Sequence, residues 1–173
     1  MPLVTLDTAA VPTPVGPFTL IVDADGAVRA GGFTDGTGPL LPLITPAVRA
    51  SVRQRAELGA VTTAIRSYLA GELTALDTLP VHQHSGEFLN HAWSVLREVK
   101  AGQPVTYRDF ATLAGRPAAV RAAANACGRN AVALIVPCHR VLRSDGSLGG
   151  YRWGLSIKKW LLDHEREVTD RGR

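Results

Sequence analysis

The residues best suited to chemistry in this chain are three neighbours, Cys138, His139 and Arg140. They follow residues 131–136, an unbroken apolar run that predicts a buried strand. A cysteine thiolate is a strong nucleophile, and nearby cations lower the thiol pKa from its usual value of about 8.5. Cys138 is therefore a candidate nucleophile, although a single cysteine is also a common inert core residue.

Sequence adjacency alone does not make Cys138 and His139 a catalytic pair. Neighbouring side chains point to opposite faces of a strand and diverge by about 100° in a helix. For His139 to take the thiol proton, the chain must turn sharply here, or a water must bridge the two groups. A third group should orient the imidazole. Spacing leaves four downstream candidates open: Asp145, Asp163, Glu165 and Glu167.

The segment after this triplet combines glycines with aromatic side chains. The glycines of residues 143–154 predict a flexible or tightly turned loop. Tyr151 and Trp153 offer flat apolar surfaces, on which a planar heterocycle stacks for about 1–3 kcal/mol per base. The alternative is that both rings only close the core.

Charge is distributed unevenly along the chain. Residues 1–96 carry a net charge of −3, whereas residues 97–173 carry +7. This asymmetry indicates nucleic acid or a membrane surface as a partner, unless the second half simply presents a solvated basic face.

Composition and cysteine content narrow the class of protein. With 46% hydrophobic residues, the 173-residue chain is expected to fold as one domain or two small lobes. Two cysteines exclude a disulfide scaffold and a Cys-rich zinc site, and they fit a reducing cytoplasm. The longest apolar stretch, residues 131–137, is too short for a membrane helix of about 20 residues. The N-terminus lacks the pattern of a secretion signal, so we expect a cytoplasmic protein without a membrane partner.

The N-terminal half predicts a supporting lobe. Residues 16–22 and 27–33 predict a β-hairpin, and the Pro- and Gly-containing residues 34–46 predict a loop. Apolar residues at helical spacing predict a helix over about residues 61–71, and residues 76–81 predict another strand. This half contains no cluster of catalytic side-chain types.

The C-terminal half is predicted to be mostly helical. Helices are expected at residues 87–100, at 107–114 with Thr106 as the cap, and at 118–127. The last two, joined by a tight glycine-containing turn, resemble a helix-turn-helix. A final amphipathic helix is expected from residue 158 to about 165, followed by a polar tail.

The second helix of this pair carries few side chains that read DNA sequence. Its residues are almost all small, and Arg121 is its one long cation. A recognition helix normally bears several polar side chains that contact base edges. This helix therefore indicates close non-specific or minor-groove contact with a duplex. The alternative is an Ala-rich packing helix with a solvated arginine.

Together these segments resemble the O6-alkylguanine-DNA alkyltransferases, also called methylated-DNA–protein-cysteine methyltransferases. Order and spacing agree across about residues 88–166, and residues 14–33 resemble the family's N-terminal hairpin. The resemblance rests on residues 105–107, Arg121, Asn130, residues 136–141 (VPCHRV), residues 150–155 (GYRWGL), residues 158–162 (KKWLL) and Glu165.

The resemblance implies a mixed α/β (α+β) fold. Residues 1–84 would form a supporting N-terminal lobe of sheet and helix. Residues 85–173 would form a mostly helical DNA-binding and alkyl-acceptor domain that contains the helix-turn-helix.

The resemblance also implies a function in DNA repair. The protein would flip O6-alkylguanine, and also O4-alkylthymine, out of duplex DNA and transfer the alkyl group irreversibly to its own cysteine, once per molecule. Its partner would be double-stranded DNA, with which it would associate in the nucleoid. We expect no cofactor, no metal and no obligate protein partner, and a monomer.

Family membership further implies a role for each matching residue in the reaction. Cys138 would accept the alkyl group, with His139 acting through a water as its base. Glu165 would orient His139, and Asn130 would hold the turn that carries the reactive segment.

Other positions would handle the target nucleotide. Tyr107 would press on the DNA backbone and hydrogen-bond the guanine, and Arg121 would fill the gap left in the base stack. Tyr151 would line the pocket and help neutralise the leaving guanine. The remaining expected contacts with the base or with DNA involve Cys138, Arg140, Val141, Arg152 and Trp153.

Some positions depart from the family pattern. Trp153 stands where many members have glycine, which predicts a narrow pocket that prefers methyl over benzyl-sized adducts. Ala133 replaces a proline found in some relatives and leaves one wall of the pocket undefined. The zinc-binding cluster of some relatives is missing, because no cysteine precedes Cys127 and the remaining histidines make a poor zinc site.

Two other functions remain open at this stage. A lesion-recognition protein would flip alkylated bases without reacting, but the members that only bind carry a non-nucleophilic residue in place of Cys138. A thiol hydrolase using Cys138 and His139 would turn over many times and would have no need of Arg121. We expect Cys127, on the predicted recognition helix, to be buried and inert.

Overall fold

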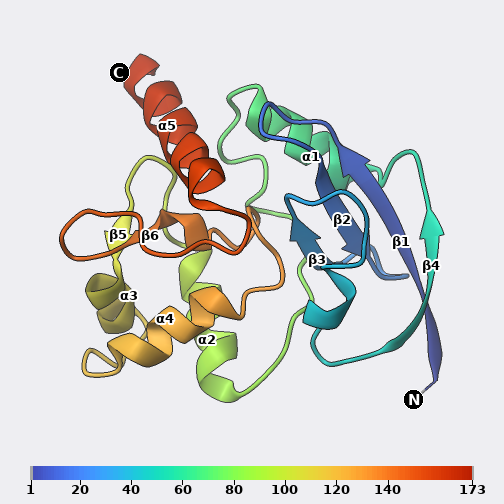
Figure 1. The fold of residues 1–173 in the computed structure, drawn as a ribbon, viewed down its shortest axis with the longest axis horizontal. Coiled ribbons are helices and arrows are strands. Elements are labelled where there is room, and N and C mark those ends of the chain that lie inside the picture. The colour runs from blue at the N-terminus through green and yellow to red at the C-terminus, as the bar shows by residue number, and fades with distance from the viewer. Residues whose placement is uncertain (1, 173) are drawn as a thin grey trace. The chain divides into compact units, whose positions relative to one another are not determined.

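The chain folds into two compact units, which a computed structural model describes for residues 2–172 (Figure 1). The first unit extends to Ser85 and also includes Ala131–Ile135. The second comprises Gly86–Asn130 and the chain from Val136 onward. A sheet forms the first unit and helices dominate the second, so the predicted mixed α/β class is confirmed. In the described part of the chain, no helix has the length and apolar character needed to cross a membrane.

A four-stranded sheet is the framework of the first unit. The predicted hairpin is confirmed as β2 (Phe18–Val22) and β3 (Val28–Gly32), which pair antiparallel and are buried throughout. Strand β1 (Leu3–Val11) lies antiparallel to β2, and β4 (Arg49–Gln54) lies parallel to β1, giving the order β3-β2-β1-β4. Sequence patterning missed β1 and β4. Strand β4 is a mostly exposed edge strand without buried alternation, so it carries no strong period-two signal.

The other elements of the first unit are short. Helix α1 (Ala60–Leu69) confirms the predicted helix, and a 3-10 turn, η1 (Leu41–Leu43), lies within the predicted loop. The strand predicted at residues 76–81 is wrong, because these residues form turns and only Val81 bridges to Val28. The apolar pattern there reflects turn side chains that point inward.

The strand predicted at residues 131–136 is also wrong, although all six residues are buried. The Ala131 carbonyl accepts the Gly31 N–H at 2.9 Å, and the Ala133 N–H donates to the Gly31 carbonyl at 3.0 Å. The chain then turns at Leu134, whose φ is +71°. A short apolar run indicates burial but does not distinguish a strand from a buried turn.

The second unit consists of five helices or helical turns that matter for the site, with two short strands. Thr106 caps the first helix of the predicted helix-turn-helix. Its hydroxyl accepts the Asp109 N–H at 3.0 Å in a capping box, as expected for a helix start. The elements are α2 (Glu87–Leu96), β5 (Val105–Thr106), α3 (Tyr107–Leu113), α4 (Val120–Gly128), the 3-10 turn η2 (Cys138–Arg140), β6 (Val141–Leu142) and α5 (Leu155–Arg171).

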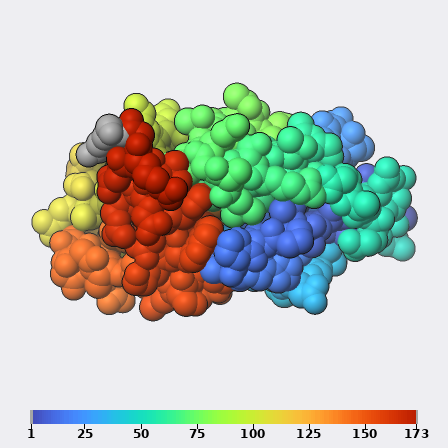
Figure 2. All heavy atoms as spheres, turned by 90° about the horizontal axis from the view of Figure 1, so that it is seen from above, coloured from blue at the N-terminus to red at the C-terminus, as the bar shows by residue number. Residues whose placement is uncertain are grey.

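These helices correct several predicted boundaries. Helix α2 ends at Leu96 rather than residue 100, where turns lead to Gly102. Helix α5 starts at Leu155 and continues to Arg171, so the predicted polar tail is helical. Its last turns contain Glu, Arg and other residues with adequate helix propensity, although they bury little apolar surface. Figure 2 shows α5 in red on the surface of the second unit, next to the orange residues that precede it.

Helix α2 anchors the helix-turn-helix. Helices α3 and α4 pack together across a turn in which Gly115 adopts a φ of +84°. The Trp93 indole of α2 donates to the Ala126 carbonyl of α4 at 2.9 Å, and this bond is buried. The small-residue helix is thus fixed at its C-terminal half, close to the segment that leads to the reactive turn.

Candidate active site

A sharp turn at Cys138, one of the two arrangements that the sequence left open, is present. Residues Cys138–Arg140 form the 3-10 turn η2. Just before it, the chain already bends tightly, because the Cys138 N–H donates to the Val136 carbonyl at 2.8 Å. The Asn130 amide holds the approach to this turn by donating to the same carbonyl at 2.8 Å. Its side chain also hydrogen-bonds the Cys138 thiol. Asn130 therefore fixes both the backbone and the sulfur of the reactive turn.

A buried carboxylate connects this turn to α5. Glu165 Oε2 lies 2.8 Å from His139 Nε2, and both side chains are almost completely buried. Arg140 donates to both oxygens of Glu165, from Nε and from Nη2, each at 2.9 Å. Of the four carboxylates that spacing left open, Glu165 is therefore the one that contacts the imidazole.

The electrostatics favour a neutral His139. Burial lowers the pKa of His139, and the opposing effect of the Glu165 carboxylate does not restore it. Burial raises the pKa of Glu165, but His139 and Arg140 outweigh burial and hold that pKa well below its usual range. An ionised Glu165 accepts from His139 Nε2–H, which assigns the lone pair to Nδ1. His139 Nδ1 is buried and has no hydrogen-bond partner among the described residues. Its lone pair is therefore available to accept a proton, as a general base requires.

Cys138 is a thiol rather than a thiolate in this environment. Burial raises its pKa, and the hydrogen bond from Asn130 and the Lys158 cation offset only part of that rise. A neutral thiol is a weak nucleophile. The sulfur must therefore lose its proton as it reacts, so the chemistry at Cys138 requires a base.

Lys158 is a site residue that sequence reasoning missed. Its side chain is completely buried, and Nζ donates to the Val141 carbonyl at 2.8 Å and to the Gly150 carbonyl at 3.1 Å. It thereby ties β6 to the end of the following loop. A sequence signal was available: Lys158 and Glu165 are seven residues apart and so share the buried face of one helix.

The two tyrosines occupy different positions. The Tyr151 hydroxyl is buried and has no hydrogen-bond partner among the described residues, and burial raises its pKa well above the usual value. It is therefore a neutral donor without an acceptor. Tyr107 begins α3 and is half-buried. Its ring packs so closely on Gly149 that a Cβ there would lie 3.0 Å from the hydroxyl.

Tyr107 also lies on an open pocket of about 530 Å³. This pocket contains Arg121 of α4, so the structure brings these two predicted DNA-contacting residues to one opening. Its lining residues are Tyr107, Val120, Arg121, Ala124, Arg143, Gly149 and Gly150.

The remaining predicted contact residues are placed differently. The Arg140 guanidinium is buried, with Nη1 donating to the Val99 carbonyl at 2.7 Å in addition to its bonds with Glu165. The Val141 carbonyl already accepts from Lys158. Arg152 is exposed and donates to the Gly128 carbonyl at the end of α4, at 2.6 Å. Trp153 is half-buried in the loop before α5.

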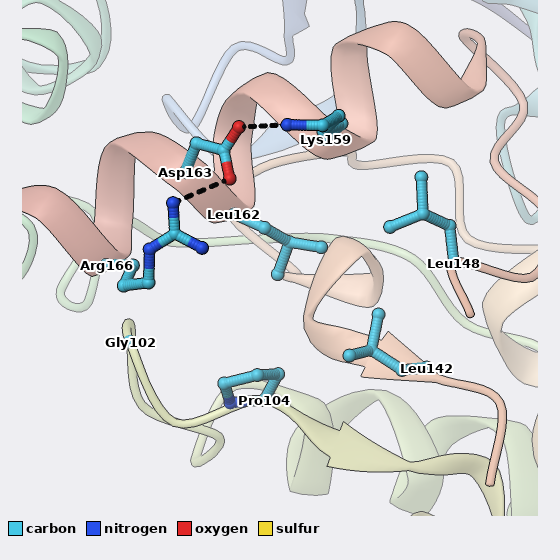
Figure 3. A pocket seen from close by; sticks show the side chains of 8 residues that line it. All are labelled: Gly102, Pro104, Leu142, Leu148, Lys159, Leu162, Asp163 and Arg166. Carbon is cyan, nitrogen blue, oxygen red and sulfur yellow. Dashed lines mark hydrogen bonds and ion pairs between the residues drawn. The ribbon is translucent and has the colours of Figure 1, made fainter. Parts of the chain in front are cut away.

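A second pocket, of about 390 Å³, contains none of the residues of the Cys138 network (Figure 3). Its apolar side chains come from Leu142, Leu148, Leu162 and Pro104. At its polar edge Asp163 pairs with Lys159 at 2.6 Å and with Arg166 at 3.1 Å. Because it lacks a nucleophile and an unpaired base, we do not assign the reaction to it. Nor does the described chain hold any group of three His, Cys, Asp or Glu side chains suited to a metal ion.

Comparisons with known proteins show which family the chain is similar to. A family model described as "6-O-methylguanine DNA methyltransferase, DNA binding domain" matches residues 87–167. The methylated-DNA–protein-cysteine methyltransferase of Shigella flexneri is 35% identical over 156 residues, which cover 88% of this chain and 91% of that protein. The human protein of the same name is 43% identical over 86 residues, covering 50% of this chain and 42% of the human protein. The crystal structure of Mycobacterium tuberculosis OGT in complex with DNA matches with a TM-score of 0.76 and 27% identity, covering 95% of this chain and 94% of that one.

The buried imidazole makes stability dependent on pH. The unfolded chain protonates His139 below about pH 6.5, whereas the folded protein keeps it neutral because burial lowers its pKa. The unfolded state therefore binds more protons, and stability falls as pH decreases from 6.5. Below about pH 4.5, Glu165 adds to the loss in the same direction. We expect stability, measured by urea unfolding, to decline between pH 6.5 and 5 by at most about 1.6 kcal/mol, the limit for a single histidine.

The His139→Gln variant should lose the upper part of this pH dependence while keeping a donor for Glu165. His91→Gln, at an exposed position on α2, serves as the control and should retain the full profile. If His139→Gln and the parent protein show the same slope between pH 6.5 and 5, the buried neutral state assigned to His139 is wrong.

Proposed function

The chain belongs to the methylated-DNA–protein-cysteine methyltransferase family, and we propose that Cys138 is the residue that takes the methyl group from O6-methylguanine in DNA. The observation that carries this assignment is the buried Cys138 turn with its neighbouring base. Among the described residues His139 Nδ1 has no hydrogen-bond partner, and His139 Nε2 is held by an ionised Glu165. Cys138 and His139 are consecutive residues of the same 3-10 turn, so the imidazole held by Glu165 adjoins the cysteine in the chain.

The reaction follows from the protonation states. As the Cys138 sulfur attacks the methyl carbon, the S–C bond forms and the C–O6 bond breaks. The thiol proton passes to His139, through a water, and Glu165 stabilises the charge that forms on the imidazole. Guanine leaves as an anion and takes up one proton, and His139 gives up the proton that came from the thiol, so the net products are S-methylcysteine and neutral guanine. A thioether carbon is not readily displaced again, so each molecule reacts once.

The leaving guanine needs a proton or a donor, because negative charge develops on its ring. The Tyr151 hydroxyl is a buried donor without an acceptor of its own, and we assign it to this charge. Donors fixed in place before the reaction stabilise developing charge without reorganisation. The proposal extends to O4-alkylthymine, which carries its alkyl group on a comparable exocyclic oxygen.

Arg140 receives a positioning role in this scheme. Its guanidinium is engaged with Glu165 and the Val99 carbonyl and is buried, so it does not contact DNA. Its charge keeps Glu165 ionised, and Glu165 in turn fixes the His139 tautomer.

The second unit supplies the contacts with DNA. The methyl group of a paired guanine is inaccessible, and extruding the base costs a few kcal/mol. Helix α4 presents small side chains that allow close approach, and Arg121 lies at the pocket opening, where it fills the space left in the stack. The net charge of +7 on residues 97–173 gives salt-dependent affinity without sequence preference. We propose that a monomer acts, without an obligate protein partner.

Intact mass after incubation with duplex DNA containing O6-methylguanine tests the acceptor assignment. We expect the protein to gain one methyl group and then stop, whereas Cys138→Ser gains none. The matched variant Cys127→Ser should react like the parent, because burial holds the pKa of the Cys127 thiol well above its usual range. Methylation that persists in Cys138→Ser would contradict the assignment, and tight lesion binding without any mass gain would favour a recognition-only protein.

Arg121→Ala separates base extrusion from the chemistry at Cys138. We expect methyl transfer from duplex DNA to slow about 10- to 100-fold, because extrusion costs a few kcal/mol and each 1.4 kcal/mol is tenfold in rate. Transfer from the free base O6-methylguanine should change less than twofold. Arg166→Ala removes the same charge from α5 and is the control for both substrates. Equal losses on duplex and free base would refute the role of Arg121.

Trp153 is expected to set the size of the alkyl group. Trp153→Gly should speed transfer from O6-benzylguanine by at least about tenfold while changing methyl transfer less than threefold, since removing the indole enlarges the pocket. Competition between methyl and benzyl substrates, read by mass, measures this ratio. The control is Trp160→Phe, which alters an indole that lies within α5 and stacks on His164. This variant should leave the ratio unchanged. An unchanged ratio in Trp153→Gly would remove Trp153 from the pocket wall.

A further inference from the structure

Arg143 occupies a defined position beside Tyr107 that the proposed mechanism does not use. Strands β5 and β6 pair in parallel, with Val105 opposite Val141 and Thr106 opposite Leu142. Tyr107 and Arg143 directly follow the last of these paired residues, so the two backbone positions are adjacent to the end of the two-stranded ladder. Both line the open pocket, consistent with this placement.

The turn after β6 holds the Arg143 backbone in place. The Arg143 N–H donates to the Ser147 carbonyl at 3.0 Å, and the Arg143 carbonyl accepts the Gly146 N–H at 2.9 Å. Asp145 closes the turn by accepting from both the Ser147 N–H, at 2.9 Å, and the Ser147 hydroxyl, at 2.6 Å. Although this loop is exposed, the arginine therefore projects from a closed turn rather than from a freely moving segment.

The Arg143 guanidinium forms no ion pair within residues 2–172, although its charge contributes to the lowered pKa of Asp145 in the same turn. No carboxylate of the described chain lies within ion-pair distance, and the residues that line the open pocket include two arginines and no acidic residue. Arg121, the other arginine, is already assigned to the base stack. The pocket opening thus presents a second, unused guanidinium that is exposed to solvent.

We propose that Arg143 binds a backbone phosphate next to the extruded guanine and so fixes the flipped nucleotide against Tyr107. This inference rests on the proposed function. A guanidinium matches two phosphate oxygens in a bidentate contact. The base edge is a less suitable target, because Arg143 is exposed at the opening whereas Cys138, at which the base must arrive, is buried. Phosphate contacts position a duplex without reading its sequence, as a repair protein requires.

Removing single phosphate charges tests this contact. Duplexes carry O6-methylguanine, with each of the nearest three phosphodiesters on either side replaced in turn by a neutral methylphosphonate. Binding is measured across a series of salt concentrations for protein in the Cys138→Ser background, so that no transfer occurs. The variants are Arg143→Ala and, as the matched control, Arg166→Ala, which removes one positive charge from the edge of the second pocket.

We expect the parent to lose about 5- to 10-fold in affinity at one replaced phosphate. Arg143→Ala should bind the unmodified duplex about as weakly and should be insensitive to that replacement, because the two partners of one contact are not additive. Its plot of log affinity against log salt should be shallower by about 0.9, the value for one phosphate contact. Arg166→Ala should retain both the sensitivity and the slope.

Other results would overturn the inference. If Arg143→Ala kept the parent's sensitivity to the replaced phosphate, or if Arg166→Ala changed the salt slope equally, Arg143 would contribute only general surface charge. With Cys138 restored, transfer from free O6-methylguanine should be within twofold of the parent in Arg143→Ala. A loss there equal to that on duplex DNA would assign Arg143 to the base instead. Absence of transfer in the parent itself would refute the proposed function, separately from the role of Arg143.

Discussion

The arrangement of the site depends on one carboxylate placed in the protein interior. An isolated buried carboxylate would cost several kcal/mol, so Glu165 persists as an ion only because charged and polar donors surround it. His139 and Arg140 supply them, from consecutive positions of one 3-10 turn. The same bonds that satisfy Glu165 therefore fix the orientation of the turn on which Cys138 sits. Stability and catalytic geometry have a common origin here.

Helix α5 extends this principle to the loop on the other side of the cysteine. Lys158, two turns before Glu165 on the same helix face, is a second buried ionisable group, and it is satisfied by two backbone carbonyls. One helix face thus carries an anion that holds the reactive turn and a cation that holds β6 and Gly150. Each charge has its hydrogen-bond partners only in the folded arrangement. Displacement of either segment would therefore leave a buried charge without partners, which costs free energy.

Sequence reasoning predicted the elements whose signals are local. The hairpin of β2 and β3, helix α1 and the Thr106 cap each depend on turn residues, spacing or a capping side chain within a few positions. The strand predicted at residues 131–136 was wrong because the conformation of this segment depends on hydrogen bonds with Gly31, which is remote in sequence. Spacing places Lys158 and Glu165 on one face of a helix, but it does not show what either side chain contacts, because that depends on how α5 packs on the turn. The family resemblance implied the role of Glu165, whereas the contacts of Lys158 became evident only in the structure.

The interrupted path of the chain through the first unit has a consequence for biosynthesis. That unit ends at Ser85 but is completed by Ala131–Ile135, so the Gly31 backbone groups have no partner until those residues have been made. At a synthesis rate of about 5–20 residues per second, the intervening chain delays completion of the sheet unit by about 3–10 s. The stretch whose arrival completes it leads directly into the reactive turn. On the ribosome, the N-terminal unit therefore reaches its final form only as the segment carrying Cys138 emerges.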